Sequence, residues 1–382
     1  MKNRRGFLTH GMTAAGLTAG NTLFGGETAD AQTWERSATH DRLIRVGALT
    51  SGFHHHLHNI WGPMINPVPA NDRNPTILPR MNGLLLTHVW DVIEEHGKAF
   101  AEKFNVKQVE RYDDMIGQVD AVMVCEVWSI DHWPQLARPY LEAGMPVFFN
   151  RPFASSMKAA KELVAMSKAN DAPICTLSSW EYCFPASAMR RNLLRLGGGK
   201  LPEIRGIVAY NASHDITHDI HGLWLILASV GPGVESVSAT IVGDTIYETA
   251  TTTWTLRFRE RDNNPPFFAC LVNTIDVDSN AWIKIITDKG TVETSLSNLD
   301  SYDMRRMEYF NTPLIEFQKM VERGVMPQTH EHILDKTAVF LAGVKSVRER
   351  NGGMVALDEL EDSYYVQADD GIEEYPEDMF RR

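Results

Sequence analysis

The pattern of apolar and polar positions divides the chain into two halves of different character. Between about residues 43 and 165, short apolar runs alternate with amphipathic segments, such as the strand LLLTHVWD, the helix EEHGKAFAEKF and the strand VDAVMVCEV. Strands that alternate with helices at this spacing are typical of a parallel sheet with right-handed crossovers. We therefore expect an α/β fold that begins with a doubly wound domain over residues 42–165.

The second half has a different pattern. It begins with the helix SSMKAAKELVAMSKAN and the strand PICTLSS, and later apolar runs follow one another without helices between them: VESVSATIV, TTTWTLRFRE, FFACLVNTID, AWIKIITD and TVETSL. Consecutive strands of this kind predict a mostly antiparallel sheet. Two helices, TPLIEFQKMVERG and HILDKTAVFLAGVKSVRER, close the fold. We expect residues 166–382 to form a second α/β domain with a large open sheet.

A segment without any period interrupts the first half. Residues 59–82 read NIWGPMINPVPANDRNPTILPRMN, which is rich in proline. Proline fixes φ and removes a backbone donor, so we expect a long insertion loop in the first domain. Loops of this length in compact domains are more often functional than idle.

Length and charge limit the classes of partner. A chain of 382 residues is longer than one compact core usually holds, which supports two domains. The formal net charge is -12. Because nucleic acids and anionic membranes are bound by clustered lysine and arginine, this charge argues against both as partners.

The first residues have the pattern of an export signal. Arg4–Arg5 is followed by Phe7–Leu8, a mildly apolar region and the small residues of Ala29–Ala31, the order of a twin-arginine signal peptide over residues 1–31. The apolar region is interrupted by polar residues and is shorter than the about 20 residues that a membrane span needs. We expect no membrane span and a periplasmic or secreted protein. Twin-arginine export usually carries proteins that are already folded, often with a cofactor or metal.

The cysteines give no metal or redox motif. Cys125 and Cys270 lie in apolar, strand-like runs, so we expect buried thiols. No Cys-x-x-Cys pair occurs. A disulfide between Cys175 and Cys183 stays open at this point, because an exported protein permits it.

The stretch NASHDITHDIHGLW carries the densest group of candidate functional side chains. It places His214, His218 and His221 at positions i, i+4 and i+7. If the stretch is helical, all three imidazoles project from one face into the same cleft. A single helical histidine is usually held by a hydrogen bond or by solvent, whereas three on one face indicate a functional group.

The same histidines predict a metal site. Neutral imidazole is a common ligand of zinc and similar metals, and His214 and His218 have the spacing of two ligands on one helix. His221 lies about 10 Å along the axis from His214 at about 1.5 Å per residue, so the third ligand should come from elsewhere. The run HHHLH after the first strand offers His55 and His58. We expect a divalent metal such as zinc or manganese; the alternative is a polar loop with one packed histidine.

The order of several motifs resembles the Gfo/Idh/MocA family of sugar and polyol oxidoreductases. The resemblance runs from about Leu43 to about Gly352, and its carriers are KAFAEKFNV, VDAVMVCE, LEAGMPVFFNRPF, HDIHGLWLI and EFQKMVERGVMPQTHEHILDKTAVFLAGVKSV. It implies a Rossmann domain that binds NAD(P), followed by an α/β domain whose open sheet mediates homo-oligomers, either dimers or tetramers. It also implies an active site between the two domains.

The cofactor motif of the family is altered here. The family's first strand leads into G-x-G-x-x-G, whose glycines allow close approach of the pyrophosphate. In this chain the residues from Thr50 to His55 keep only the middle glycine, Gly52. Asp91, at the end of the second strand, matches the acidic residue that holds an adenosine ribose. Thr50, Gly52 and Asp91 are thus the candidate cofactor-binding residues.

The catalytic pattern of the family is altered as well. Its Glu-Lys-Pro becomes Asn150-Arg151-Pro152, and an arginine stays charged and mainly binds anions. Its D-x3-H-x2-D becomes H-x3-H-x2-H, in which only His218 keeps the family's residue. Tyr182 replaces a family arginine, whereas His132 matches the family's histidine after the fourth strand. The candidate catalytic residues are His218, Arg151, Tyr182, His221 and His132.

Three functions stay open. The first is acid-base chemistry on a uronate-containing glycan: Arg151 or a metal neutralises the carboxylate, and a histidine or Tyr182 then serves β-elimination. Hydrolysis fits the same residues. The second is an NAD(P)-dependent oxidoreductase, and the third is a sugar-binding protein without catalysis. The ligand in each is a small molecule or an oligosaccharide.

Overall fold

A computed structural model describes most of the chain. The described residues are 43–50, 52, 56–68, 80–125, 127–212, 216–247, 249–261, 264–274, 281–296 and 310–367. Several predictions fall on residues outside these ranges: the signal peptide over residues 1–31, the acidic end of the chain, residues 69–79 of the insertion, and the candidate metal ligands His55 and His214.

A six-stranded parallel sheet forms the first half. The strands have the order β3-β2-β1-β4-β5-β6, and every neighbouring pair is parallel. They are β1 (Ile44–Leu49), β2 (Leu84–Trp90), β3 (Lys107–Gln108), β4 (Ala121–Val124), β5 (Val147–Phe149) and β6 (Ile174–Thr176). The order changes direction at β1, so the adjoining carboxyl ends of β1 and β4 form the switch point where ligands of such sheets bind.

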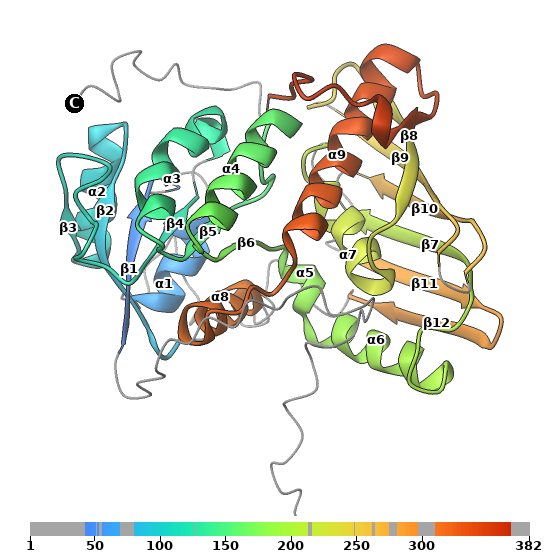
Figure 1. The fold of residues 1–382 in the computed structure, drawn as a ribbon, viewed down its shortest axis with the longest axis horizontal. Helices are drawn as coiled ribbons and strands as arrows, with labels where there is room; N and C mark the ends of the chain where they lie inside the picture. The colour runs from blue at the N-terminus through green and yellow to red at the C-terminus, as the bar shows by residue number, and fades with distance from the viewer. Residues whose placement is uncertain are drawn as a thin grey trace, which may run out of the picture. The chain divides into compact units, whose positions relative to one another are not determined.

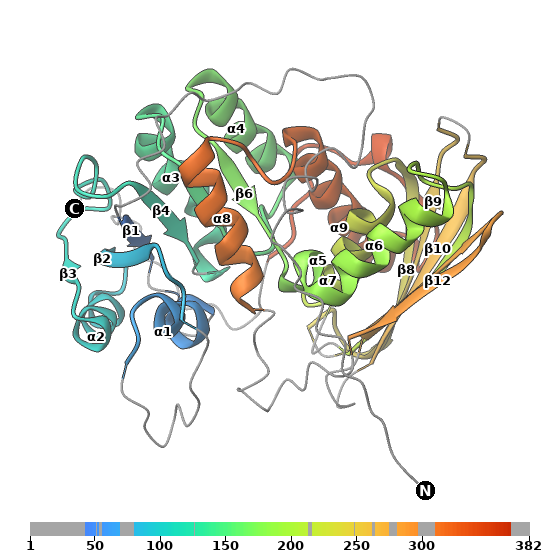
Figure 2. The same ribbon diagram turned by 90° about the horizontal axis from the view of Figure 1, so that it is seen from below.

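Helices cover both faces of this sheet. Figure 2 shows α1 (Gly62–Ile65) and α2 (Glu94–Phe104) on one side and α3 (Trp133–Glu142) and α4 (Met157–Ala169) on the other. Sequence determines their ends: Asn105 closes α2 in the left-handed conformation, and the Ser156 hydroxyl caps α4 by accepting from the N–H of Ala159. The doubly wound first domain is thereby confirmed.

The predicted insertion loop begins as a helix. A π-helical turn (Leu57–Trp61) runs directly into α1. Trp61, Met64 and Ile65 are buried in the core that α2 shares, so burial of these apolar side chains outweighs the local signal of Pro63. Pro63 itself occupies the start of α1, where a missing N–H is harmless.

A seven-stranded sheet forms the second half. Its order is β12-β11-β7-β10-β9-β8-β13. Its strands are β7 (Ile204–Ala212), β8 (Val234–Gly243), β9 (Thr249–Phe258), β10 (Phe267–Thr274), β11 (Ala281–Thr287), β12 (Gly290–Ser295) and β13 (Val355–Ala356). Only β7 and β10 pair in parallel, so the sheet is mostly antiparallel, as the sequence predicts.

Helices cover one face of this second sheet. In Figures 1 and 2, α6 (Phe184–Leu196), α7 (Ile220–Val230) and α9 (His330–Arg350) lie on the same side. Gly343 allows α9 to approach β9, because a Cβ there would lie 1.7 Å from the Trp254 ring. The opposite face exposes apolar side chains, and none of the helices that the structure describes covers it: Val208, Phe268, Val272, Trp282 and Ile286.

The first sheet reaches further along the chain than expected. The boundary that we expected near residue 165 falls inside α4, and β6 pairs with β5 in the first sheet. The helix α8 (Thr312–Arg323) also returns to that sheet, where the rings of Phe317 and Phe148 lie 5.6 Å apart. Long-range packing of this kind leaves no trace in local periodicity.

Two smaller findings complete the fold. All four cysteines are free; Cys125, Cys175 and Cys183 are buried, whereas Cys270 is exposed on the outer face of β10, so the prediction of a buried Cys270 is wrong. Alternation along β10 places every second side chain outside, which an apolar run conceals. None of the helices in the described residues is long and apolar enough to cross a membrane.

Candidate functional site

Thr50 and Gly52 lie after the carboxyl end of β1 in the parallel sheet. Thr50 follows β1 in the left-handed region, with φ 74°, and its N–H donates to the carbonyl oxygen of Trp90 at 2.9 Å. Its hydroxyl accepts from the N–H of Cys125 at 3.3 Å. Gly52 has φ 61°, and a Cβ there would lie 3.2 Å from that of Cys125 and 3.3 Å from that of Leu57. Gly52 is therefore the residue that lets the backbone pass this point.

Asp91 lies beside that turn. It follows β2, the neighbour of β1, and only 7% of it is exposed. Its Oδ1 accepts from the N–H of Ile93 at 3.0 Å. Gly97 of α2 packs against it, since a Cβ at Gly97 would lie 3.3 Å from the Cβ of Asp91. An acidic side chain held at the carboxyl end of the second strand fits the ribose of a dinucleotide, and Gly52 fits close approach of its phosphates.

A row of hydrogen bonds continues along this edge to Arg151. The Asn150 amide donates to the carbonyl oxygen of Cys125 at 3.0 Å, and the Thr176 hydroxyl donates to the carbonyl oxygen of Asn150 at 3.3 Å. The row thus links the ends of β1, β4, β5 and β6. It fixes Asn150, which directly precedes Arg151 in the chain, and Arg151 is 6% exposed.

Next to β6 lies an ion pair that the sequence does not reveal. Lys336 of α9 donates to Glu181 at 2.8 Å, and both side chains are fully buried. Lys336 also donates to the carbonyl oxygen of Thr176 at 3.1 Å and to Gln328 at 3.2 Å. Its ammonium lies 3.4 Å from the centre of the Trp224 ring. Burial lowers the pKa of Lys336 to about 8, against the opposing charge of Glu181.

His221 and His218 come together at the start of α7. The Nδ1 atom of His221 lies 2.7 Å from the Ser178 hydroxyl. Its ring lies 5.5 Å from that of Trp180 and 6.3 Å from that of His218. The helix α7 begins only at Ile220, so the condition of the sequence prediction, a helix that carries the histidines on one face, is not met at His218. A turn, and not helical spacing, brings these two rings together.

Asp219 anchors that turn to the second sheet. It is fully buried, and its Oδ2 accepts from the Trp254 indole at 2.6 Å and from the Thr252 hydroxyl. Both donors belong to β9, more than 30 residues away in the chain. The carboxylate therefore stabilises the turn. It also fixes the positions of the two adjacent residues, His218 and Ile220.

Tyr182 and His132, the other catalytic candidates on helices, make contacts of their own. The Tyr182 hydroxyl donates to the carbonyl oxygen of Pro327 at 3.3 Å. Burial, together with the charge of Glu181, raises the pKa of Tyr182 well above its usual value, so it carries its proton at neutral pH. His132 lies at the start of α3, with Nδ1 3.3 Å from the Gln135 side chain.

His58 packs against α2. Its ring lies 5.9 Å from that of Phe100 and 6.0 Å from that of Phe104, and Lys103 donates to its carbonyl oxygen at 2.8 Å. The described part of the chain contains no group of three histidine, cysteine or acidic side chains that could hold a metal ion. With His55 and His214 outside that part, the metal site stays a prediction.

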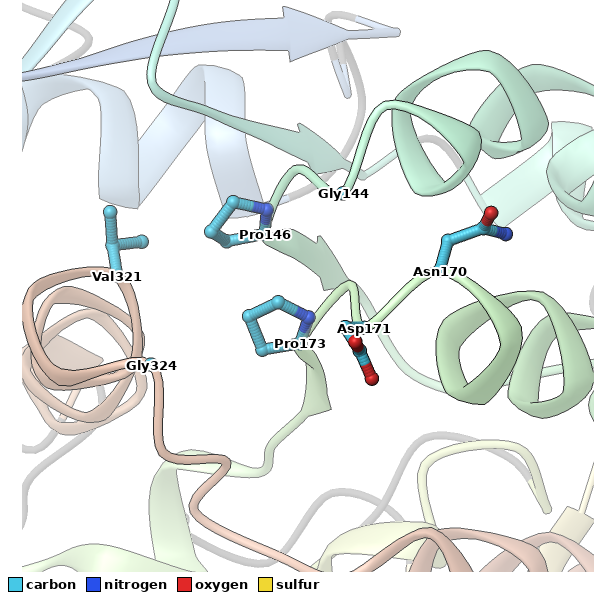
Figure 3. A pocket seen from close by; sticks show the side chains of 7 residues that line it. All are labelled: Gly144, Pro146, Asn170, Asp171, Pro173, Val321 and Gly324. Carbon is cyan, nitrogen blue, oxygen red and sulfur yellow. The ribbon is translucent and has the colours of Figure 1, made fainter. Parts of the chain in front are cut away.

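A small crevice lies at the other end of the parallel sheet. Its volume is about 140 Å³, and Figure 3 shows Pro146 and Pro173, which directly precede β5 and β6, in its wall. None of the candidate site residues lines it. Thr50, Asp91 and Arg151 lie at the opposite edge of the sheet, after the carboxyl ends of β1, β2 and β5.

A protein-family model matches part of the first domain. Residues 70–176 match the oxidoreductase family GFO_IDH_MocA, NAD-binding Rossmann fold. This part of the chain is similar to the Gfo/Idh/MocA family. The predicted resemblance is confirmed, and the matched residues include Asp91 and Arg151 but begin after the Gly52 turn.

Solved structures share this Gfo/Idh/MocA-like fold. The myo-inositol dehydrogenase from Lactobacillus casei, in complex with NAD(H) and myo-inositol, is 14% identical with a TM-score of 0.67 and covers 82% of this chain and 97% of its own. The scyllo-inositol dehydrogenase from Lactobacillus casei, with bound NAD(H) and scyllo-inositol, is 15% identical with a TM-score of 0.65 and covers 83% and 100%. At this identity the likeness establishes the fold. Comparison with curated proteins finds no significant match.

One functional signal in the sequence was overlooked. Ser178 and Glu181 form a capping box at the start of α5 (Ser179–Tyr182), and the pattern S-x-x-E before a helix can be read from sequence. It would have located Ser178, the partner of His221. Lys336 had no such signal, because 155 residues separate it from Glu181.

Proposed function

We propose that this chain is a nicotinamide-dependent oxidoreductase that acts on a hydroxyl group of a sugar or polyol. The observation that carries the proposal is the pairing of the Gly52 turn with Asp91 at the carboxyl ends of adjacent strands, in a domain that matches an NAD-binding family model. The inositol dehydrogenases of similar fold contain NAD(H) and an inositol. Of the three functions left open by the sequence, we therefore prefer the oxidoreductase.

Each residue then has a role. Asp91 holds the adenosine ribose, and Gly52 lets the phosphates approach the backbone. A bound nicotinamide supplies the acceptor for a hydride. His218 and His221 bind the substrate hydroxyl, and one of the two takes up its proton. Arg151, which keeps its charge at any accessible pH, binds an anionic group.

A nicotinamide fluorescence titration tests this proposal. We expect NADH or NADPH to bind, and Asp91→Ala to weaken binding by about 10- to 100-fold, the equivalent of about 1.5–3 kcal/mol for hydrogen bonds to a charged group. Glu142→Gln, on the exposed surface of α3, is the matched control and should leave affinity unchanged. Absence of binding, or equal affinity in wild type and Asp91→Ala, contradicts the proposal.

Acid-base chemistry on a uronate-containing glycan is the second candidate function. The arginine at position 151, in place of the family's lysine, favours it, because a guanidinium can neutralise a uronate carboxylate. Zinc or manganese at the histidines would strengthen the same effect. An unsaturated or hydrolysed product formed without nicotinamide, with a stoichiometric metal in the purified protein, would establish this function instead. A sugar-binding protein without catalysis would show no turnover that His218→Ala could abolish.

We also propose that two copies associate through the outer face of the second sheet. That face exposes Phe268, Val272 and Trp282 at 50%, 36% and 37%, and exposed apolar surface of this kind marks protein interfaces. Sedimentation of wild type should show a dimer or tetramer, and Phe268→Lys should shift it toward monomer. Monomeric wild type would contradict this proposal.

Export by the twin-arginine route is the last part of the proposal. It is supported by Arg4–Arg5 and the apolar region that follows. N-terminal analysis of protein from the periplasm should find Gln32 first, and replacement of both arginines by lysine should keep the full chain in the cytoplasm. Processing that does not depend on these arginines would refute it.

A further inference from the structure

We propose that Ser178 is a positioning residue that holds His221 with its proton on Nε2, so that His221 donates to the substrate oxygen and His218 receives the substrate's proton. The inference rests on the proposed function, because that function gives both histidines their contact with substrate. It goes further by assigning different roles to two residues of the same type.

The hydrogen bonds of Ser178 determine the direction of its contact with His221. Ser178 is the N-cap of α5 and is 1% exposed. Its oxygen accepts from the N–H of Trp180 at 3.3 Å and, in the capping box, from the N–H of Glu181. A hydroxyl has two acceptor sites and one hydrogen. With both acceptor sites used, only the hydrogen is left for His221, 2.7 Å away.

This direction selects a tautomer. If the Ser178 hydroxyl donates to Nδ1, that nitrogen must be the unprotonated one of the neutral ring, and the proton lies on Nε2. His221 can then donate a hydrogen bond from Nε2, but it cannot accept a proton there. When a substrate alcohol is oxidised, its hydroxyl proton therefore goes to His218, whose ring lies 6.3 Å from that of His221.

Ser178 is itself held by a buried charge network. Its N–H donates to Oε2 of Glu181 at 2.6 Å, while Oε1 accepts from Lys336 and from Gln328, each at 2.8 Å. Every donor of the Lys336 ammonium has an acceptor in this network. Charge-assisted bonds of this kind leave little freedom to the cap. The network thereby holds Ser178 in place, and Ser178 in turn orients the His221 ring.

The test is a ¹⁵N NMR measurement of histidine tautomers in the full chain. With ¹⁵N-labelled histidine, and with His221→Gln to identify the signals, we expect wild-type His221 to be protonated on Nε2 and to show an unprotonated, hydrogen-bonded Nδ1. Ser178→Thr keeps the hydroxyl and should preserve this spectrum. Ser178→Ala should convert it into a mixture of tautomers. A proton on Nδ1 in wild type, or equal spectra in wild type and Ser178→Ala, overturns the inference.

Kinetics complete the test. Ser178→Ala should lower kcat about 10-fold, which corresponds to about 1.4 kcal/mol, with KM changed less than two-fold, because Ser178 does not touch substrate. Ser178→Thr should restore most of kcat. The NMR result does not need turnover: the predicted tautomer without any nicotinamide-dependent activity would refute the proposed function and leave the role of Ser178 intact, whereas activity with the opposite tautomer would do the reverse.

Discussion

At the scale of single residues, the buried pair of Lys336 and Glu181 has the largest energetic consequence. Moving two charges out of water is costly, and the pair is tolerated because its hydrogen bonds are complete. Glu181 accepts from Ser178, Gln328 and Lys336. Removal of one partner leaves the other charge buried and unpaired. We therefore expect such a removal to lower the free energy of unfolding much more than the removal of one member of a surface pair does.

Lys336→Met should therefore lower the free energy of unfolding by about 3–5 kcal/mol. The matched control is Lys168→Met. Lys168 pairs with Glu331 at a similar distance, 2.9 Å, but the side chains are 51% and 70% exposed, so the control should cost at most about 1 kcal/mol. Urea denaturation of the three proteins measures both values. Similar losses in the two variants would show that burial does not govern the pair.

His332 gives a prediction for the dependence of stability on pH. Burial and the charge of Lys336 lower the pKa of His332 from 6.5 to about 3. The folded protein thus keeps this ring neutral where the unfolded chain takes up a proton, so its contribution is complete above pH 6.5 and is lost as pH falls toward 3. Wild type should lose about 2 kcal/mol more than His332→Gln between pH 7 and pH 5. Parallel stability curves for the two proteins would contradict this.

At the scale of elements, amphipathic periodicity predicts helices reliably, whereas the clustering of histidines does not. The amphipathic patterns of α2 and α9 predict helices that the structure contains. The histidines share one face only if their stretch is helical, whereas α7 begins at Ile220 and β9 holds Asp219 in the preceding turn. Local propensity contains no information about that contact. The strand β7, which ends at Ala212, is not predicted by the sequence analysis; the structure pairs it with β10 and β11.

Some residues of the candidate site can be predicted from the sequence, and others cannot. Gly52 and Asp91 could be placed at the carboxyl edge from the sequence, because the ends of parallel strands meet there. The contact of Ser178 with His221 could not be foreseen, because it joins the end of β6 to the first turn of α7 across 43 residues. The structure leaves the predicted roles of Tyr182, His132 and the metal ligands as predictions.

The turn before α7 can be tested through Trp254. Trp254→Phe removes the indole donor from buried Asp219, and we expect a loss of about 1–3 kcal/mol in stability. Phe184→Leu is the control, since Phe184 is 77% exposed and lies outside the proposed interface; its effect should stay within about 0.5 kcal/mol. Thermal and urea unfolding decide it. An equal effect in both variants would mean that Asp219 does not depend on the indole.

At the scale of the whole molecule, the end of the described chain connects elements of both sheets. Val366 donates its N–H to the carbonyl oxygen of Ser155 at 2.8 Å, and Tyr247, between β8 and β9, donates to the carbonyl oxygen of Gln367 at 2.8 Å. The Tyr365 hydroxyl donates to Asp131, next to His132, at 2.6 Å. Together with the Ser178–His221 contact, these bonds join the edge that carries Asp91 to the turn that carries the histidines.

The account depends most on hydride transfer, and an isotope experiment measures it directly. The protein is incubated with NAD⁺ or NADP⁺ and with inositols and hexoses that carry deuterium on the hydroxyl-bearing carbons. We predict that deuterium appears in the reduced nicotinamide and that Asp91→Ala slows the transfer at a cofactor concentration below the wild-type Kd. An unsaturated or hydrolysed sugar with no deuterium in the nicotinamide would contradict the account.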